Sequence, residues 1–285
     1  MALMLALLSA AFYGTADFLG GLGARRAPAL AVTVCAQGVG FLVVVLAMPL
    51  FPSALPSTTG ALWGIGAGLT GGLGVALLYY GFAVGRVSVV APVTAVCSIT
   101  IPVLVAIGVG ERPGVLALLG IAVAVASVAL ISRHDDSART AQVGDGGEPR
   151  TRDRSLAIAL GSGAAIGAFF VCLARNDSGL WPLLIARAAS TLALAAAARL
   201  AGVSLAVPAR ALPIVVACGA LDMLANALYL IAVRQGPLGI VATLASLYPA
   251  STVLLARVVL GERLRPVQSV GLACAAAAVV LITTR

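Results

Sequence analysis

Three ionisable side chains lie well inside apolar stretches of the sequence, namely Asp17, Arg187 and Asp222. A charge at the centre of a bilayer costs roughly 2.5–3.5 kcal/mol on insertion scales, so such residues tend to be functional. A carboxylate at this depth can bind a proton or a cation, and a guanidinium can bind a carboxylate or phosphate through two parallel hydrogen bonds. The alternative is structural: Arg187 could pair with Asp222 or Asp17 to hold the fold, and Asp17 could cap a helix end.

Polar residues at helical spacing form stripes around these positions: Asp222, Asn226 and Tyr229; Ser9, Tyr13 and Asp17; and Thr33 with Gln37. Residues at i, i+4 and i+7 share one face of a helix. A polar face turned toward lipid would be costly, so we expect these stripes to line a cavity. A seam of hydrogen bonds between helices is the alternative. We predict Asp222 as a proton-binding site, with Asp17 as the second choice.

Two prolines, Pro102 and Pro249, lie inside apolar segments that occupy related places in the two halves of the chain. A proline within a helix removes a backbone hydrogen bond and frees a carbonyl group one turn earlier. Interrupted helices at corresponding positions of two halves often mark a binding site within a membrane. We therefore expect the polar side chains beside these prolines to contact a ligand, while simple packing kinks are the alternative. These side chains are Ser98, Ser246 and Tyr248.

The turn Gly110–Glu111–Arg112 recurs as Gly261–Glu262–Arg263. A carboxylate in such a turn can accept hydrogen bonds from the free N–H groups at the start of the next helix. A glycine fits the end of the preceding helix, where the backbone often turns left-handed. We predict that Glu111 and Glu262 are structural capping residues rather than ligand-binding ones.

The positions on either side of these turns also match in the same register, because Gly120 falls on Gly271 and Leu130 on Leu281. The chain is therefore two copies of one unit. The first copy covers residues 1–132, a polar linker covers 133–154, and the second copy covers 155–285. The linker is rich in Gly, Asp and Arg, and it needs no chemistry of its own.

The composition is that of a membrane protein, with 61% hydrophobic and 10% charged residues, whereas soluble chains carry about 25% charged residues. Ten apolar segments are long enough to span a bilayer. They are 2–23, 29–51, 59–83, 88–109, 114–132, 155–174, 180–202, 211–233, 238–260 and 266–284. Because each copy has an odd number of helices, five, the second copy enters the membrane from the opposite side, and both chain ends lie on one face. The predicted fold class is an all-α integral membrane protein of ten transmembrane helices in two inverted five-helix repeats.

Other classes of function find little support. The formal net charge of +8 comes from arginines that stand mostly in short loops, which is typical of membrane topology and not of a nucleic-acid surface. The five cysteines stand singly, so we expect no disulfide framework and no metal site. The sequence has no HExxH, P-loop or nucleophile-elbow motif. We therefore expect no enzymatic activity, no cofactor and no nucleic-acid partner.

These residues resemble the EamA type of the drug/metabolite transporter superfamily. The resemblance rests on the two Gly-Glu-Arg turns, on Pro249 thirteen residues before Glu262, and on Arg187 early in its segment. It covers both halves, although Gln37 takes the place equivalent to Arg187 and Ser98 the place equivalent to Pro249. The resemblance implies a central cavity between the repeats, cytoplasmic chain ends and movement of small metabolites or drugs. The loop arginines favour the opposite orientation, so the orientation stays open.

We expect a secondary transporter, most simply an exporter working by alternating access in the plasma or inner membrane. Its partners would be a small-molecule substrate and the lipid bilayer, and a homodimer is left open. Metabolite or amino-acid export is favoured over drug efflux; an anion would suit Arg187, and a cationic drug would suit Asp17 or Asp222. The alternative is a membrane-embedded scaffold, or a partner of a flippase for lipid-linked groups, without solute turnover.

Overall fold

The structure is a computed structural model that describes residues 1–24, 26–84, 87–131, 149–175, 178–260 and 266–283. Within the described ranges the chain is almost entirely helical, and no strand occurs there. The first half contains α1 (Ala2–Ala24), α2 (Ala29–Ala47), the short 3-10 helix η1 (Met48–Leu50), α3 (Thr58–Val84), α4 (Val87–Gly108) and α5 (Val115–Ile131). The second half contains α7 (Pro149–Ala174), α8 (Trp181–Leu200), α9 (Leu212–Val233), α10 (Leu238–Ala245), α11 (Tyr248–Leu260) and α12 (Pro266–Thr283).

The apolar helices account for most of the predicted membrane spans. Within the described residues, six helices are long and apolar enough to cross a membrane. Four shorter apolar stretches occupy the other predicted spans: Thr94–Gly108, Val115–Leu130, Leu238–Thr252 and Pro266–Ile282. With 17 residues, α5 is about 26 Å long, which is less than the ~30 Å hydrocarbon core of a bilayer. The structure therefore confirms an all-helical, multi-pass membrane protein, with six of its spans clear by length.

Glycines end two of the helices in the way the sequence predicts for Gly110. This glycine has a φ of 98° and follows α4, and its N–H donates to the carbonyl oxygen of Ile107. The next N–H, of Glu111, donates to the carbonyl oxygen of Ala106. This pair of bonds is a Schellman motif, which satisfies carbonyl groups that the helix leaves free. Gly202 ends α8 with the same pair of bonds at a φ of 64°.

The ninth predicted span, 238–260, is two helices rather than one kinked helix. α10 ends at Ala245 and α11 begins at Tyr248, so Pro249 stands in the first turn of α11, where a missing N–H costs nothing. The related segment of the first half, α4, continues through Pro102 without a break. Ser98 stands where the second half has Pro249, and a serine keeps its backbone N–H. The prediction of interrupted helices in both halves is therefore wrong for the first half.

The last residues of the predicted linker belong to a helix. α7 begins at Pro149 rather than near residue 155, because proline suits the first turn of a helix and nothing in the following residues breaks it. Residues 132–148 lie outside the described ranges.

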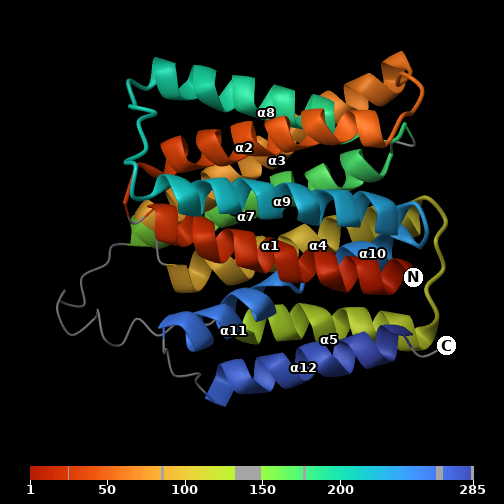
Figure 1. The fold of residues 1–285 in the computed structure, drawn as a ribbon. Helices are drawn as coiled ribbons and strands as arrows, with labels where there is room; N and C mark the ends of the chain where they lie inside the picture. Colours follow the sequence, from red (N-terminus) through yellow and green to blue (C-terminus); the bar gives the residue numbers. More distant parts are fainter. Residues whose placement is uncertain (25, 85–86, 132–148, 176–177, 261–265, 284–285) are drawn as a thin grey trace.

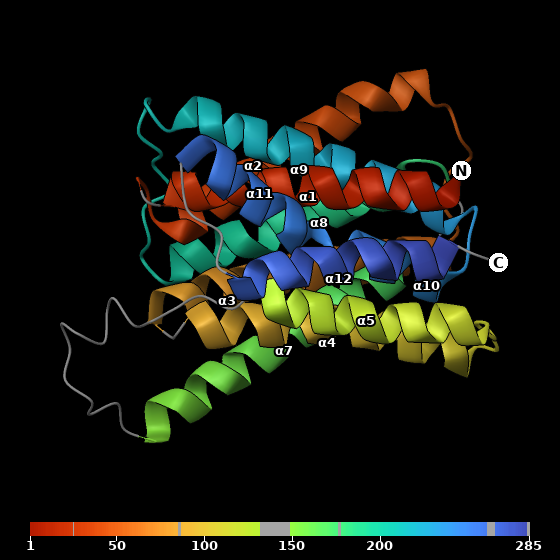
Figure 2. The same ribbon diagram turned by 90° about the horizontal axis from the view of Figure 1, so that it is seen from below.

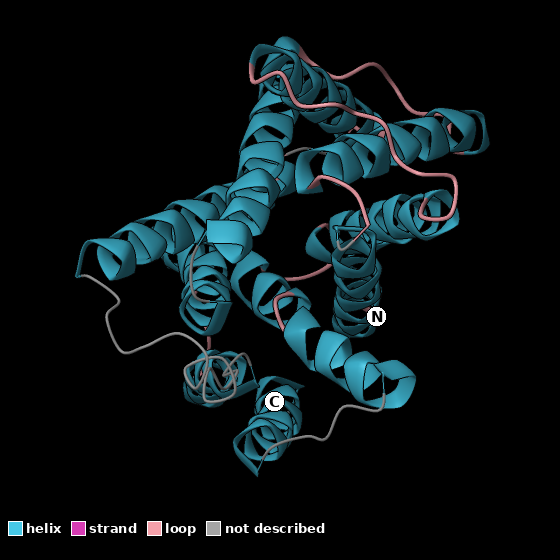
Figure 3. Ribbon diagram, turned by 90° about the vertical axis from the view of Figure 1, so that its left-hand side faces the viewer, coloured by secondary structure: helices cyan, strands magenta, loops and turns pink. Residues whose placement is uncertain are grey.

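The helices of the two halves pack on each other in matched pairs. In order along the chain, α7, α8 and α9 of the second half correspond to α1, α2 and α3 of the first. The contact of α1 with α9 therefore matches that of α7 with α3, and the contact of α2 with α9 matches that of α8 with α3. α10 and α11 together correspond to α4, and they pack on α1 as α4 packs on α7. The corresponding helices α2 and α8 contact each other, and so do α5 and α12. The α5–α12 pair lies at one edge of the bundle, where α5 also contacts α4, α10 and α11 (Figures 1 and 3). Exchanging the halves leaves this pattern unchanged, as expected for two copies of one unit.

The direction of the chain follows the same pattern. α1 begins and α12 ends at the same end of the bundle, whereas α7 begins at the opposite end (Figures 1 and 2). The two copies therefore start from opposite ends of the bundle.

Small residues bring α3 close to α8 beside the centre of the molecule. A Cβ atom at Gly68 would lie 2.8 Å from the Cα atom of Ala186, closer than real side chains come. A Cβ atom at Gly72 would lie 3.1 Å from the Cβ atom of Ser190. This glycine face lets the two backbones approach each other, and it also forms one wall of the site described next.

Candidate functional site

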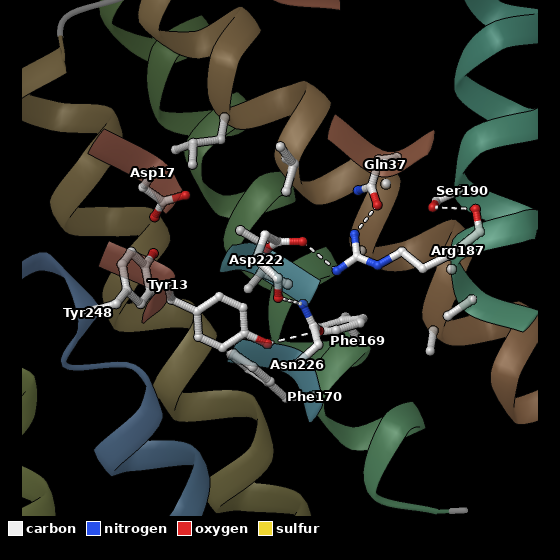
Figure 4. A pocket seen from close by; sticks show the side chains of 18 residues that line it. Tyr13, Asp17, Gln37, Phe169, Phe170, Arg187, Ser190, Asp222, Asn226 and Tyr248 are labelled. Carbon is white, nitrogen blue, oxygen red and sulfur yellow. Dashed lines mark hydrogen bonds and ion pairs between the residues drawn. The ribbon is translucent and has the colours of Figure 1, made fainter. Parts of the chain in front are cut away.

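A central cavity lies among helices of both halves, with an empty volume of about 680 Å³ that includes its open mouth. Its lining comes from α1, α2 and α3 of the first half and from α7, α8, α9 and α11 of the second. The polar side chains that line it are shown in Figure 4: Tyr13, Asp17, Gln37, Arg187, Ser190, Asp222, Asn226 and Tyr248. An apolar lining with a few convergent polar groups is typical of sites for small organic ligands.

The Arg187 guanidinium is the centre of the polar cluster. Its Nη2 forms an ion pair with the Asp222 carboxylate, and its Nη1 donates a hydrogen bond to Oε1 of Gln37 (Figure 4). Arg187 is only 6% exposed, and a buried guanidinium needs such partners because desolvation of its charge is expensive. Of the two roles that the sequence left open for Arg187, the structure shows the pairing with Asp222, at the wall of the cavity. Gln37, which stands in the place equivalent to Arg187, joins the first half to this pair.

The polar stripes of α1 and α9 face each other. The Tyr13 hydroxyl donates to Oδ1 of Asn226 over 2.9 Å, and Nδ2 of Asn226 donates to the carbonyl oxygen of Asp222 over 2.7 Å. Deeper along α1, the Ser9 hydroxyl donates to the carbonyl oxygen of Ala225 over 2.8 Å. The stripes therefore form both a cavity wall and a seam between helices, the two alternatives that the sequence left open.

Tyr229, the last residue of the predicted stripe on α9, lies outside the lining of the cavity. Its side chain is fully buried, and its hydroxyl donates to the carbonyl oxygen of Phe170 over 3.1 Å. The Tyr229 ring packs on the Phe170 ring with centroids 4.7 Å apart. This residue supports the cavity wall from behind.

Asp17 differs from the other charged groups of the cavity in having no partner. No described residue donates a hydrogen bond to its carboxylate or forms an ion pair with it. Asp17 lies on α1 well before the end of that helix at Ala24, so it does not cap the helix end. In Figure 4 Asp17 lies on the same side of the cavity as Tyr13 and Tyr248. The cavity therefore holds one carboxylate that remains free to meet a ligand.

Aromatic side chains form the wall next to Asp17. The Tyr13 ring centroid lies 6.1 Å from that of Phe170 and 6.5 Å from that of Tyr248. Phe169 extends the wall, with its centroid 5.4 Å from that of Phe170. Sequence reasoning missed Phe169 and Phe170. The signal was available: two adjacent aromatic residues within an apolar segment of a chain that is only 5% aromatic.

The structure does not bring the two predicted serines into the cavity. Ser98 is fully buried, and its hydroxyl donates to the carbonyl oxygen of Ala95 in its own helix over 2.8 Å. Ser246 is fully buried at the break between α10 and α11, and its hydroxyl has no hydrogen-bond partner among the described residues. Only Tyr248, two residues further on, lines the cavity.

Glu111 caps a helix, but not the one the sequence suggested. Its carboxylate accepts hydrogen bonds from the N–H groups of Leu238 over 2.7 Å and Gly239 over 3.2 Å. These are the first residues of α10, in the other half of the protein, whereas we expected the following helix, α5. The free N–H groups at the start of α10 attract a carboxylate in the same way. Glu262 of the second turn lies outside the described residues.

An apolar groove adjoins the cavity between α2, α3 and α8, with an empty volume of about 1360 Å³ including open space. Its walls are mainly leucines and alanines, and it shares Gly68, Gly72 and Ser190 with the cavity. Among the described residues that line this groove, the Tyr80 phenol is the one ionisable side chain. Among the described residues, no three His, Cys, Asp or Glu side chains come together as a metal site.

Comparisons with known proteins agree with this architecture. The model of the EamA-like transporter family matches residues 1–133 and 155–284. One solved crystal structure resembles this one with a TM-score of 0.77 and 16% sequence identity, over 99% of this chain and 96% of the other, which shows the shared fold. No curated protein sequence gives a significant match. Because the family model covers most of the sequence in two blocks, the chain belongs to the EamA-like transporter family, within the drug/metabolite transporter superfamily.

Proposed function

We propose that the protein is a secondary transporter that binds a small organic solute in the central cavity and moves it across the membrane by alternating access. The observation that carries this proposal is the cavity itself, whose charged lining lies inside apolar helices, away from their ends, and comes from both halves of the chain. Charged residues at that depth are expensive and are typical of a pathway for solutes or protons. A purely structural scaffold would gain nothing from an unpaired carboxylate there.

The packing of the halves supports alternating access. The main contacts between the halves have counterparts with the halves exchanged, and the two copies start from opposite ends of the bundle. Two inverted copies can exchange conformations by rocking against each other, which opens the site first to one side and then to the other. We propose ten spans in two inverted repeats, with α10 and α11 together forming the ninth span.

Export driven by a proton gradient fits the cavity best if Asp17 carries the proton. The sequence favoured Asp222, but Asp222 is held by Arg187, whereas Asp17 has no partner among the described residues. A group that binds and releases a proton in each cycle must be free of a permanent counter-ion. In this proposal Asp17→Asn abolishes uphill transport driven by a pH gradient and leaves exchange at equal pH intact.

The test is counterflow in proteoliposomes. A thermal-shift screen of amines, amino acids, carboxylates and nucleosides on the purified protein identifies solutes that bind, because a ligand raises the melting temperature. Each stabilising solute is then loaded into proteoliposomes, and uptake of the labelled solute is followed. Exchange above that of protein-free vesicles supports the proposal. Solutes that bind but never cross the membrane would show a scaffold or binding protein instead.

A further inference from the structure

The charges that line the cavity do not cancel. Two carboxylates, Asp17 and Asp222, and one guanidinium, Arg187, line it, so the ionised cavity carries a net charge of −1. Arg187 already directs one terminal nitrogen to Asp222 and the other to Gln37. Asp222 already balances the charge of Arg187, so an anionic ligand bound at the guanidinium would lie beside a carboxylate of like charge, which disfavours it. The remaining charge is the Asp17 carboxylate, which favours a cation.

The surroundings of Asp17 fit a cation of a particular kind. Tyr13 and Tyr248 line the same side of the cavity as Asp17, and Phe169 and Phe170 continue the aromatic wall (Figure 4). The face of an aromatic ring attracts a positive charge within about 6 Å of its centre, and such rings are a common means of binding organic ammonium groups. A small inorganic cation would gain little from this wall, and the described residues offer no cluster of ligands for a metal.

We propose that the cavity binds an organic ammonium ion, with its charged nitrogen between Asp17 and the rings of Tyr13 and Tyr248 and its apolar body along Phe169 and Phe170. This assignment concerns the ligand of the cavity in the transporter proposed above, and of the anion and the cation that the sequence left open it selects the cation. Gly71 and Gly72 of α3 form the facing wall, and Gly71 lies close to the Phe169 ring, since a Cβ atom there would come within 2.8 Å of its Cδ2.

Ligands that share one apolar body separate the alternatives. Isothermal titration of the full-length protein in detergent is carried out with phenethylamine, its trimethylammonium analogue, phenylalanine and 3-phenylpropionate. We expect both cations to bind, phenylalanine to bind at least tenfold more weakly than phenethylamine, and phenylpropionate not to bind. Binding of phenylpropionate, or tighter binding of phenylalanine than of phenethylamine, overturns the proposal, because either result makes Arg187 the recognition group.

Variants of the cavity locate the ligand. Asp17→Asn is expected to weaken the binding of phenethylamine at least tenfold, while Asp17→Glu keeps part of the affinity. Tyr248→Leu should weaken binding about five- to thirtyfold, the range of a desolvated cation–π contact. Trp63→Leu, at a half-exposed aromatic position of α3 outside the cavity, serves as the control and should leave affinity unchanged. If Asp17→Asn does not fold, Tyr248→Leu alone decides, and unchanged affinity in that variant overturns the proposal.

Binding and transport can fail separately. Binding of phenethylamine without its exchange in proteoliposomes would disprove the transporter and leave the ligand assignment standing. Exchange of carboxylates with no binding of either cation would disprove the ligand assignment and leave the transporter standing.

Discussion

At the scale of single residues, the ion pair between Arg187 and Asp222 decides which charge the cavity offers to a ligand. Arg187 is 6% exposed, and the Asp222 side chain is 31% exposed, so the pair sits at the boundary between the protein interior and the cavity. Pairing turns a costly buried cation into a fixed part of the wall. Asp17 then remains as the charge that a ligand can use.

We predict that Arg187→Met or Asp222→Leu alone destabilises the protein more than both together. Each single change leaves an unpaired charge, which should cost about 2–3 kcal/mol of unfolding free energy, below the range for a fully buried pair because Asp222 is partly exposed. The double variant removes both charges and should recover most of this loss. Thermal unfolding in detergent measures the stability of the two single variants and the double variant. Equal melting temperatures of the wild type and both single variants would show that the pair adds no stability.

Part of this site could be predicted from sequence and part could not. Helical spacing placed Asp222 and Asn226 on one face of α9, and the cost of buried charge singled out Asp17 and Arg187. The spacing carried no information on partners in other helices, such as Tyr13, which lies 213 positions from Asn226. It also grouped Tyr229 with the cavity face, because only the packing of Phe170 against Tyr229 reveals that this ring is covered.

At the scale of helices, the close approach of α3 and α8 is what shapes the cavity wall. We predict that Gly68→Ala forces these helices apart, because its Cβ atom would lie 2.8 Å from the Cα atom of Ala186. The expected cost is about 1–3 kcal/mol, as for overpacking of a core. Gly38→Ala is the matched control within α2, where the new Cβ atom would meet nothing within 4 Å. It should stabilise the protein by up to about 1 kcal/mol, because alanine favours a helix. Equal melting temperatures of the two variants would contradict the contact.

A second prediction at this scale concerns the capping of α10 by Glu111. Glu111→Ala leaves the N–H groups of Leu238 and Gly239 without their acceptor, and loss of a capping side chain costs about 1 kcal/mol. Glu111→Gln keeps one acceptor oxygen and should lose less. Melting temperatures of the two variants give the comparison. A variant series in which Glu111→Ala is as stable as the wild type would rule out this cap.

The helices themselves were largely predictable, whereas their breaks and partners were not. Apolar length and turn residues located the segments, and Gly110 was predicted correctly as a helix end. The division of α10 from α11 depends on where Pro249 stands relative to a helix start, which periodicity does not reveal. The helix that Glu111 caps is more than a hundred residues away in the chain, so only the fold identifies it.

At the scale of the whole molecule, the two copies start from opposite ends of one bundle. We predict that a single cysteine appended to either chain end of a cysteine-free variant reacts from the same side of the membrane. Ser204→Cys, in the exposed loop between α8 and α9 at the opposite end of the bundle, should react only from the other side (Figure 1). An impermeant maleimide applied to intact and opened vesicles makes the measurement. Labelling of the two chain ends from opposite sides would contradict an inverted repeat.

The apolar groove between α2, α3 and α8 affects how the concentration of a lipid-soluble solute should be expressed. Because it shares Gly68, Gly72 and Ser190 with the cavity, the site has an apolar neighbour along the sides of the helices as well as a polar interior. A solute that dissolves in the bilayer reaches a concentration in the lipid that is set by its partition coefficient. For such solutes, half-saturation expressed per volume of water would shift with the amount of lipid present, whereas half-saturation expressed per mole of lipid would stay constant.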